Sequence, residues 1–328
     1  INFAIQIILL KLPSFLVLSF PMAVLLGTLL GYSRMSSNSE IKALRSIGIS
    51  TRRIIAAALA LGILMTGMTF IFNDLIVPNA NRRAEMTLRR GLGVSMHSDY
   101  AQDVMYSRYG EIKDIKSQKS WRGMTQLFYA KTFKNRLMID VTVLDFSRAG
   151  YKQMLTAKQG SWNQSNGSWD FEDGNILTVA SDGSLTSVDF ENYIYPLDSG
   201  PEKIARLPKD ANNMTLVDAL KAQKLYSDSG NIKEYRRIQV RIQEKFTLPM
   251  ACIVFSLIGS TLACKNNTRT TQSQGFGLSI ILIFLYYILS FVFSSLGVSG
   301  TLSPFVAAWS PVFISLSVGF YLLGKAGD

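Results

Sequence analysis

The sequence is poor in charge, cysteine and histidine, and each shortage removes a class of protein. Of 328 residues, 48% are hydrophobic and 17% are charged, against roughly 25% charged in ordinary soluble domains. Cys252 and Cys264 are the two cysteines and both lie in an apolar stretch, so the polar region has no disulfide framework. With His97 as the single histidine and no CxxC motif, Ser-His-Asp hydrolases and zinc enzymes have little to build on. This composition indicates a membrane protein with a sizeable polar part.

The net charge of +11 does not create a basic polar face. The long polar block 74–244 is nearly balanced in charge, and the excess of Lys and Arg lies in and around the apolar segments. A protein that binds nucleic acid would concentrate its basic residues on one polar surface. We therefore expect no nucleic-acid partner.

Five apolar segments are long enough to cross a membrane as helices, for which about 20 residues are needed. They lie at 13–32, 54–73, 246–264, 276–296 and 303–323. None of them contains a charged residue or a histidine. Because intramembrane ionisable residues usually mark chemistry or ion passage inside the bilayer, their absence argues against a membrane enzyme that acts on lipids.

The distribution of Lys and Arg predicts how these spans are oriented. Basic residues gather in the connection 33–53, in 265–275 and at Lys325. These segments fall on one side of the membrane if all five spans cross, and we place them in the cytoplasm. The block 74–244 is then periplasmic, and so is the beginning of the chain. Since the chain starts at Ile1 without a visible signal peptide, we expect one further helix upstream and six spans in the complete protein.

The block between the second and third spans is predicted to form strands. Its segments, such as "QLFYAKTF" and "RLMIDVTVLDF", are short and rich in aromatic or β-branched residues, and "NGS", "EDGN" and "SDGS" indicate turns. Strands without intervening helices favour an antiparallel, jelly-roll-like domain. The predicted fold class is an α-helical membrane protein with an inserted all-β domain. We expect transmembrane helices in 1–75, the β domain with flanking helices in 76–230, and a long helix followed by further spans in 231–328.

The polar stretch "SSNSEIKALRSIGIS" at 36–50 predicts a short helix with a defined end on each side. Ser37 and Glu40 match a capping box at its start. Gly48 suits the left-handed position beyond a helix end, and Ile49 suits the apolar contact that follows. The residues that recur at helical spacing and form one apolar stripe are Ile41, Leu44 and Ile47.

A helix at about 37–48 is too short to be stable alone in water, so its apolar stripe needs a partner surface. Either the membrane interface and the ends of neighbouring spans cover the stripe, or another protein does. A short, stiff helix joined closely to two spans can also carry motion from a cytoplasmic motor into the membrane.

Three stretches resemble the LptF/LptG (YjgP/YjgQ) permease family. "LPSFLVLSFPMAVLLGTLLGYSRMSSNSEIKALRSIGIS", with Pro13 and Pro21, resembles the second span and coupling helix of that family. "NDLIVPNANRRAEMTLRRG" resembles its exit from the third span, and "EKFTLPMACIVFSLIGSTLA" resembles its fourth span. The resemblance covers essentially the whole chain, and the family's first helix has no counterpart in it.

The resemblance implies a permease of an ABC transporter that extracts lipopolysaccharide from the inner membrane. Its implied partners are a dimer of a cytoplasmic ABC ATPase, a second permease subunit and a periplasmic jelly-roll bridge protein, and 276–296 would belong to a lateral gate. The chain has no G-x-x-x-x-G-K-[ST] motif, so we expect no cofactor of its own, with ATP and Mg bound by the partner. The implied ATPase-coupling residues are Glu40, Ile41, Leu44, Arg45, Ile47 and Gly48.

Basic residues also flank the apolar segments on the predicted periplasmic side, against the positive-inside tendency. This basic set consists of Arg82, Arg83, Arg89, Arg90, Arg236, Arg237, Arg241 and Lys245. It can form ordinary solvated helix faces, with Glu85, Glu234 and Glu244 as partners. It can also form a ring of cations at the headgroup level, and such a ring would bind an anionic lipopolysaccharide because guanidinium groups pair bidentately with phosphates and carboxylates.

Two other functions stay open at this point. A permease for another envelope lipid or lipoprotein would usually have four spans and a differently built exterior domain, and a non-transporting membrane scaffold would purify without a bound ATPase. The aromatic residues of the β block fit either a plain hydrophobic core or a groove for acyl chains. They are Tyr106, Phe128, Tyr129, Phe146, Trp162, Trp169 and Phe171.

Overall fold

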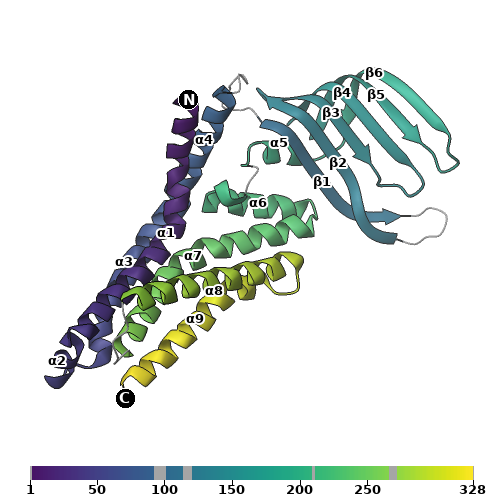
Figure 1. Ribbon diagram of the computed structural model, residues 1–328. Coiled ribbons are helices and arrows are strands. Elements are labelled where there is room, and N and C mark those ends of the chain that lie inside the picture. Colours follow the sequence, from purple (N-terminus) through teal and green to yellow (C-terminus); the bar gives the residue numbers. More distant parts are fainter. Residues whose placement is uncertain (1, 92–100, 114–119, 209–210, 266–271, 328) are drawn as a thin grey trace. The chain divides into compact units, whose positions relative to one another are not determined.

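The computed structural model describes residues 2–91, 101–113, 120–208, 211–265 and 272–327 (Figure 1). The chain divides into two compact units. Ile1–Leu88 and Arg236–Asp328 form one of them, which we call the membrane unit, and Arg89–Tyr235 form the other, the β unit.

The membrane unit is built from long helices. Its N-terminal part contains α1 (Asn2–Ser37), α2 (Glu40–Ser46), α3 (Thr51–Ile71), the π-helical turn η1 (Phe72–Ile76) and most of α4 (Val77–Gly91). Its C-terminal part contains most of α7 (Ile232–Lys265), then α8 (Gln272–Ser299) and α9 (Pro304–Gly327).

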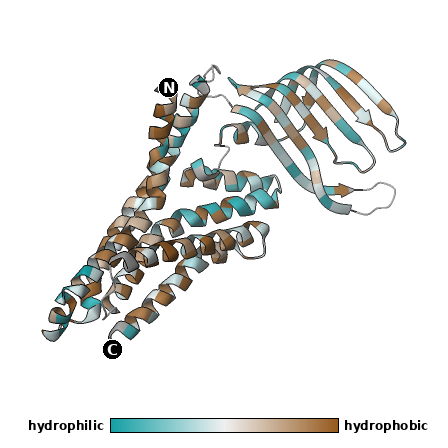
Figure 2. Ribbon diagram, in the orientation of Figure 1, coloured by the Kyte–Doolittle hydropathy of each residue, from teal (hydrophilic) through white to brown (hydrophobic). Residues whose placement is uncertain are grey.

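Within the described residues, five helical segments are long and apolar enough to cross a membrane, which confirms the five predicted spans. They are Phe3–Ser37, Thr51–Leu88, Ile232–Cys264, Phe276–Ser299 and Pro304–Lys325. The first three are longer than predicted because each helix continues past the apolar residues that define its span. Figure 2 shows this for α7, whose first half carries many hydrophilic residues while its second half is mostly hydrophobic.

Helix α7 is the central helix of the membrane unit. In the most apolar stretch of α7, 72% of the residues are buried, whereas the share is 11–28% in the other four spans. Small residues let neighbouring helices approach it closely: a Cβ on Gly62 of α3 would lie 2.3 Å from Ser256 Oγ, and one on Gly259 would lie 2.4 Å from Thr28 Oγ1 of α1. Both α1 and α3 therefore pack closely against α7.

The β unit contains one six-stranded antiparallel sheet with neighbouring strands in sequence order. The strands are β1 (Ala101–Lys113), β2 (Ser120–Lys134), β3 (Leu137–Asp145), β4 (Lys152–Asn163), β5 (Ser168–Val179) and β6 (Leu185–Tyr195). Figure 1 shows the strands bending along their length. The inserted antiparallel domain is thus confirmed, and the sheet fits a jelly-roll-like domain.

A row of charged residues crosses the sheet, one from each strand, and we call it the crease. These residues do not pair with the neighbouring strand, although the residues on either side of them do. They are Asp103, Lys131, Asp140, Lys158, Asp173 and Glu191. Asp103, Asp140 and Asp173 have left-handed φ angles of 48°, 52° and 50°. A left-handed residue inside a strand changes the direction of the strand locally, as it does in some β-bulges, and such a bend repeated in register curves the whole sheet. The segment "EDGN", predicted as a turn, is part of the crease inside β5, so that prediction was wrong.

The core of the β unit lies on one face of the sheet. Phe128, Trp169 and Phe171 are fully buried, and the helices α5 (Gly200–Ala205) and α6 (Leu216–Asp228) contribute Ile204 and Leu225 to the same cluster. These aromatic residues therefore form a hydrophobic core. Tyr129 differs, because it lies on the other face, where its hydroxyl donates to Asp103 Oδ1 at 3.1 Å.

The start of α7 is capped by Asn231. The backbone N–H of Glu234 donates to Asn231 Oδ1 at 3.2 Å, and the Asn231 amide donates to Ser107 Oγ of β1 at 3.0 Å. A single side chain therefore fixes the beginning of α7 to the first strand of the β unit.

Candidate coupling helix and basic residues

Helix α2, the candidate coupling helix, is shorter than the predicted range of about 37–48. It spans Glu40–Ser46, because α1 continues through Ser37. Ser37 is therefore helical and its hydroxyl donates back to the carbonyl of Arg34 at 2.9 Å, so the predicted capping box does not form. The chain turns instead at Ser39, which has a left-handed φ of 63°. Glu40 accepts a hydrogen bond from the Asn38 amide at 3.1 Å.

The other end of α2 is the predicted one. Gly48 has a left-handed φ of 87°. Its N–H donates to the carbonyl of Arg45 at 3.0 Å, and the N–H of Ile49 donates to the carbonyl of Leu44 at 3.1 Å. This pair of bonds is a Schellman motif, and Leu44 and Ile49 both pack against the same hydrophobic cluster. A fixed turn therefore joins α2 to α3.

The apolar stripe of α2 is divided between the protein and its surface. Ile41 is 3% exposed and packs with Ile54 and Ile55 of α3, and Leu44 packs on the edge of this cluster. Ile47 is 72% exposed because it is the residue at which the helix ends. Of the three predicted stripe residues, Ile41 and Leu44 are thus covered by the protein itself and Ile47 is not.

The base of α2 is held by the two long helices that flank it. The Tyr32 hydroxyl of α1 donates to the carbonyl of Ile54 in α3 at 2.8 Å. Glu40, Lys42 and Arg45 are exposed on the outer side of α2. The ends of the neighbouring spans thus cover part of the stripe, while Ile47 and the charged residues of α2 are exposed.

Four of the eight residues of the basic set have exposed side chains: Arg82, Arg83, Arg90 and Arg237. Arg90 belongs to the β unit, and the other three belong to the membrane unit. Arg89 lies in α4, and its side chain is outside the described residues, as is all of His97. The structure supports surface positions for these four residues only.

The remaining three residues of the basic set contact the protein itself. Arg241 forms a 2.5 Å ion pair with Glu244, one turn along α7, as the solvated-face alternative predicts for Glu244. Arg236 Nη1 lies 3.5 Å from the carbonyl of Ser299, and a Cβ on Gly300 would collide with its guanidinium. Arg236 therefore packs against the turn between α8 and α9.

Lys245 is buried, which the prediction of a headgroup-binding residue did not foresee. Its side chain is 8% exposed, and Nζ lies 3.2 Å from Oδ1 of Asp74, whose side chain is 18% exposed. Sequence reasoning missed Asp74 because it lies one residue beyond the predicted span 54–73. Its position directly before "LIVPN" was the available signal, since a proline four residues on removes a backbone donor.

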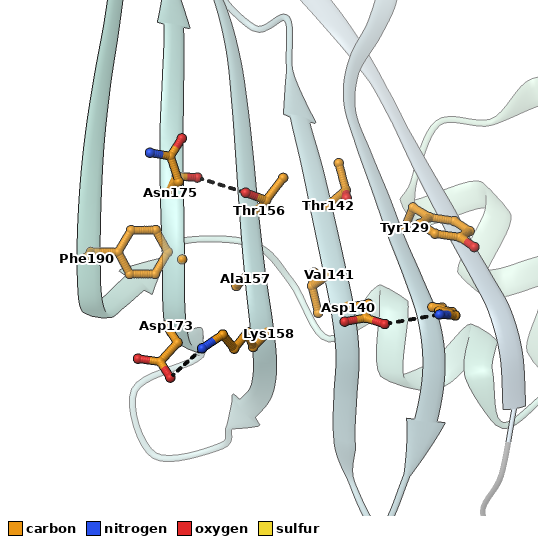
Figure 3. Close-up of a pocket in the computed structure, with 12 residues that line it drawn as sticks. Tyr129, Asp140, Val141, Thr142, Thr156, Ala157, Lys158, Asp173, Asn175 and Phe190 are labelled. Atoms are coloured by element: carbon orange, nitrogen blue, oxygen red, sulfur yellow. Dashed lines mark hydrogen bonds and ion pairs between the residues drawn. The ribbon is translucent and has the colours of Figure 1, made fainter.

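A shallow pocket of about 650 Å³ lies at the crease of the β sheet (Figure 3). Figure 3 shows the ion pair of Lys158 with Asp173, whose N–O distance is 3.4 Å. Lys131 and Asp140 form a second ion pair, with an N–O distance of 3.5 Å. The described residues that line this pocket include none of the predicted coupling or substrate residues. Since the charges of the pocket pair with one another, we assign it a structural role in the bend of the sheet.

Two comparisons with known proteins agree with this arrangement. The family described as "Lipopolysaccharide export system permease LptF/LptG" matches residues 1–325. The chain belongs to this family. It is also similar to the "Lipopolysaccharide export system permease protein LptG" of Haemophilus influenzae, with 19% identity over 312 residues, which cover 94% of this chain and 82% of that protein.

Membership of the LptF/LptG family makes the chain a subunit of a transporter and not itself an enzyme. The family and the five apolar helices together indicate a multi-pass protein of the inner membrane. The roles of α2 and of the basic set stay predictions.

Proposed function

We propose that this LptF/LptG permease extracts lipopolysaccharide from the inner membrane and passes it to a periplasmic bridge, driven by a partner ATPase. The observation that carries the proposal is α2. It is a short helix that packs on α3 through Ile41 and ends in a fixed turn at Gly48, and it exposes Glu40, Lys42 and Arg45.

The geometry of α2 supports contact with a dimeric cytoplasmic ABC ATPase. A helix of seven residues cannot hold its own shape in water, but Ile41 and Leu44 attach it to α1 and α3. Its exposed face combines charges of both signs with one apolar side chain, Ile47. The partner supplies ATP and Mg, and the permease needs no cofactor of its own.

The distribution of basic residues supports a cytoplasmic position for α2 and a periplasmic one for the β unit. In this orientation the β unit receives the lipid and passes it to a jelly-roll bridge protein. A second permease subunit, a copy of this chain or a paralogue, completes the path, with α8 as a helix of the lateral gate.

The exposed members of the basic set support an anionic substrate. Arg82 and Arg83 follow the apolar segment 54–73 of the second span, and Arg237 precedes the apolar segment 246–264 of the third, where lipid headgroups lie in the proposed orientation. Guanidinium groups at this level pair with the phosphates of lipopolysaccharide. Arg89 and Arg90 are proposed to act with them. Arg236, Arg241 and Lys245 contribute through the contacts that they make inside the protein.

The proposal is tested by purifying the tagged chain from its native membrane in mild detergent and identifying bound proteins and lipids by mass spectrometry. We expect an ABC ATPase, a second permease subunit and lipopolysaccharide. Recovery of the chain without an ATPase would support a scaffold, and recovery of an ATPase with another lipid or a lipoprotein would support a different exporter.

A further inference from the structure

The continuous helix formed by α3, η1 and α4 contains a π-helical turn, η1, shortly before Pro78. In η1, the N–H of Val77 donates to the carbonyl of Phe72, five residues back. The same pattern would pair the carbonyl of Asn73 with residue 78, but Pro78 has no N–H. π-Helical turns of this kind occur frequently at functional sites. The turn therefore leaves the Asn73 carbonyl in need of a donor from elsewhere.

Lys245 of α7 supplies this donor. Its Nζ lies 3.4 Å from the carbonyl of Asn73 and 3.2 Å from Oδ1 of Asp74. Taking two charges out of water is costly unless each finds a partner, so the ammonium and the carboxylate hold each other in place. One side chain thus fills the gap that Pro78 creates and connects the second span to the central helix.

Other contacts between α3 and α7 are made by uncharged groups. Thr66 Oγ1 donates to the carbonyl of Pro249 at 3.1 Å, and the rings of Phe70 and Phe246 stack with centroids 5.6 Å apart. Apolar and small-residue contacts allow one helix to slide along another. A buried ion pair does not, because separating its members leaves both charges unpaired. Of the contacts named here between the two helices, the Asp74–Lys245 ion pair is therefore the one that most strongly opposes sliding.

We propose that Asp74 and Lys245 are positioning residues for transport: through this pair, a displacement that α2 delivers to α3 reaches α7. The inference rests on the proposed function, since it requires a motor acting on α2. Helix α3 starts at Thr51, directly after the Schellman turn of α2, and η1 continues it to Asp74. Helix α7 is continuous from Ile232 to Lys265 and leads from the β unit into the membrane unit. The pair thus lies where the helix driven by the motor meets the helix that leads to the β unit.

The test uses the complete transporter in proteoliposomes, with ATP hydrolysis and ATP-dependent release of lipopolysaccharide measured on the same samples. The key variant is the double change Asp74→Asn, Lys245→Met, which removes both buried charges and is therefore expected to fold. The matched control is Asp228→Asn, Lys233→Met, which makes the same changes at two exposed residues on α6 and α7.

We expect the key variant to hydrolyse ATP at a rate within about twofold of wild type. The lipid released per ATP is expected to fall roughly tenfold, because the variant lacks the ion pair that links the two helices. The charge-swapped variant Asp74→Lys, Lys245→Asp is expected to regain part of this ratio, and the control to keep it. These changes in the ratio separate positioning from a purely structural role, which would lower ATP hydrolysis, lipid release and protein yield together.

The inference is wrong if the key variant releases as much lipid per ATP as wild type, or if hydrolysis and release fall in parallel. Failure of the proposed function gives a different result, because the wild-type transporter would then release no lipopolysaccharide at all. A wild type that transports and a key variant that stays coupled would overturn the inference alone.

Discussion

At the scale of single residues, Asp145 shows how hydrogen bonds outweigh burial. The N–H of Ser147 donates to its Oδ1 at 2.8 Å, and the Tyr195 hydroxyl and the Gln126 amide donate to Oδ2 at 2.6 and 3.2 Å. Burial acts to raise the pKa of Asp145, but these bonds together lower its pKa below the usual value. For Tyr195, burial and the hydrogen bond to Asp145 raise the pKa. The ionised carboxylate therefore ties β2, β3 and β6 together.

This pKa shift predicts the acid sensitivity of the β unit. Since the native pKa of Asp145 is lowered, the stability it contributes is present above its unfolded-state pKa of about 3.9 and is lost as the pH falls through the native pKa. We expect Asp145→Asn to lower the free energy of unfolding at pH 7 by about 1–2 kcal/mol and to flatten its dependence on pH below about 4. Unfolding followed by tryptophan fluorescence measures both. Equal acid dependence in wild type and variant would contradict this account.

At the scale of elements, the crease predicts where the sheet tolerates substitution. Asp140 has a left-handed φ of 52°, which β-branched residues avoid and glycine adopts freely. We expect Asp140→Val to lower the free energy of unfolding by about 1–2 kcal/mol. Asp140→Gly is the control, and it is expected to change this free energy by less than about 1 kcal/mol, because the exposed ion pair to Lys131 that it loses contributes little. Equal destabilisation by both changes would show that backbone conformation is not what the crease requires.

Elements differed in how much of them the sequence could predict. The five spans were predictable because some 20 apolar residues in a row have few other uses, and the end of α2 was predictable because Gly48 is a local signal. Its start was not, because α1 continues through Ser37 and makes a potential cap residue helical. The crease was missed for a related reason: "EDGN" has the composition of a turn, and only pairing with β4 and β6 keeps it inside a strand.

In the candidate sites, too, features set by the local sequence were predictable and features set by distant contacts were not. Exposure of Arg82, Arg83 and Glu40 was predictable from polar residues beside apolar runs. The burial of Lys245 was not, because it depends on Asp74, a residue far away in the sequence. Contacts of that kind are set by helix packing, which a single sequence does not encode in any local pattern.

At the scale of the whole molecule, three contacts connect successive parts of this LptF/LptG family member. Helix α2 packs on α3 through Ile41. The turn η1, which continues α3, is joined to α7 by Asp74–Lys245, and Asn231, directly before α7, donates to Ser107 of β1. The last two of these contacts are an ion pair and a hydrogen bond, whereas the contact of α2 and the packing of the spans are made by apolar and small residues. Under the proposed function, these contacts form the route by which force applied at α2 would reach α7.

The central claim, that α2 receives the action of a partner ATPase, is tested most directly by the double variant Glu40→Ala, Arg45→Ala in the reconstituted transporter. Both side chains are exposed on α2, so the variant is expected to insert into the membrane and keep its stability. The measurement is lipopolysaccharide released per ATP hydrolysed. We predict that the ratio falls at least roughly tenfold, a loss of about 1.4 kcal/mol or more of coupling free energy. An unchanged ratio, with the ATPase still bound, would contradict the account.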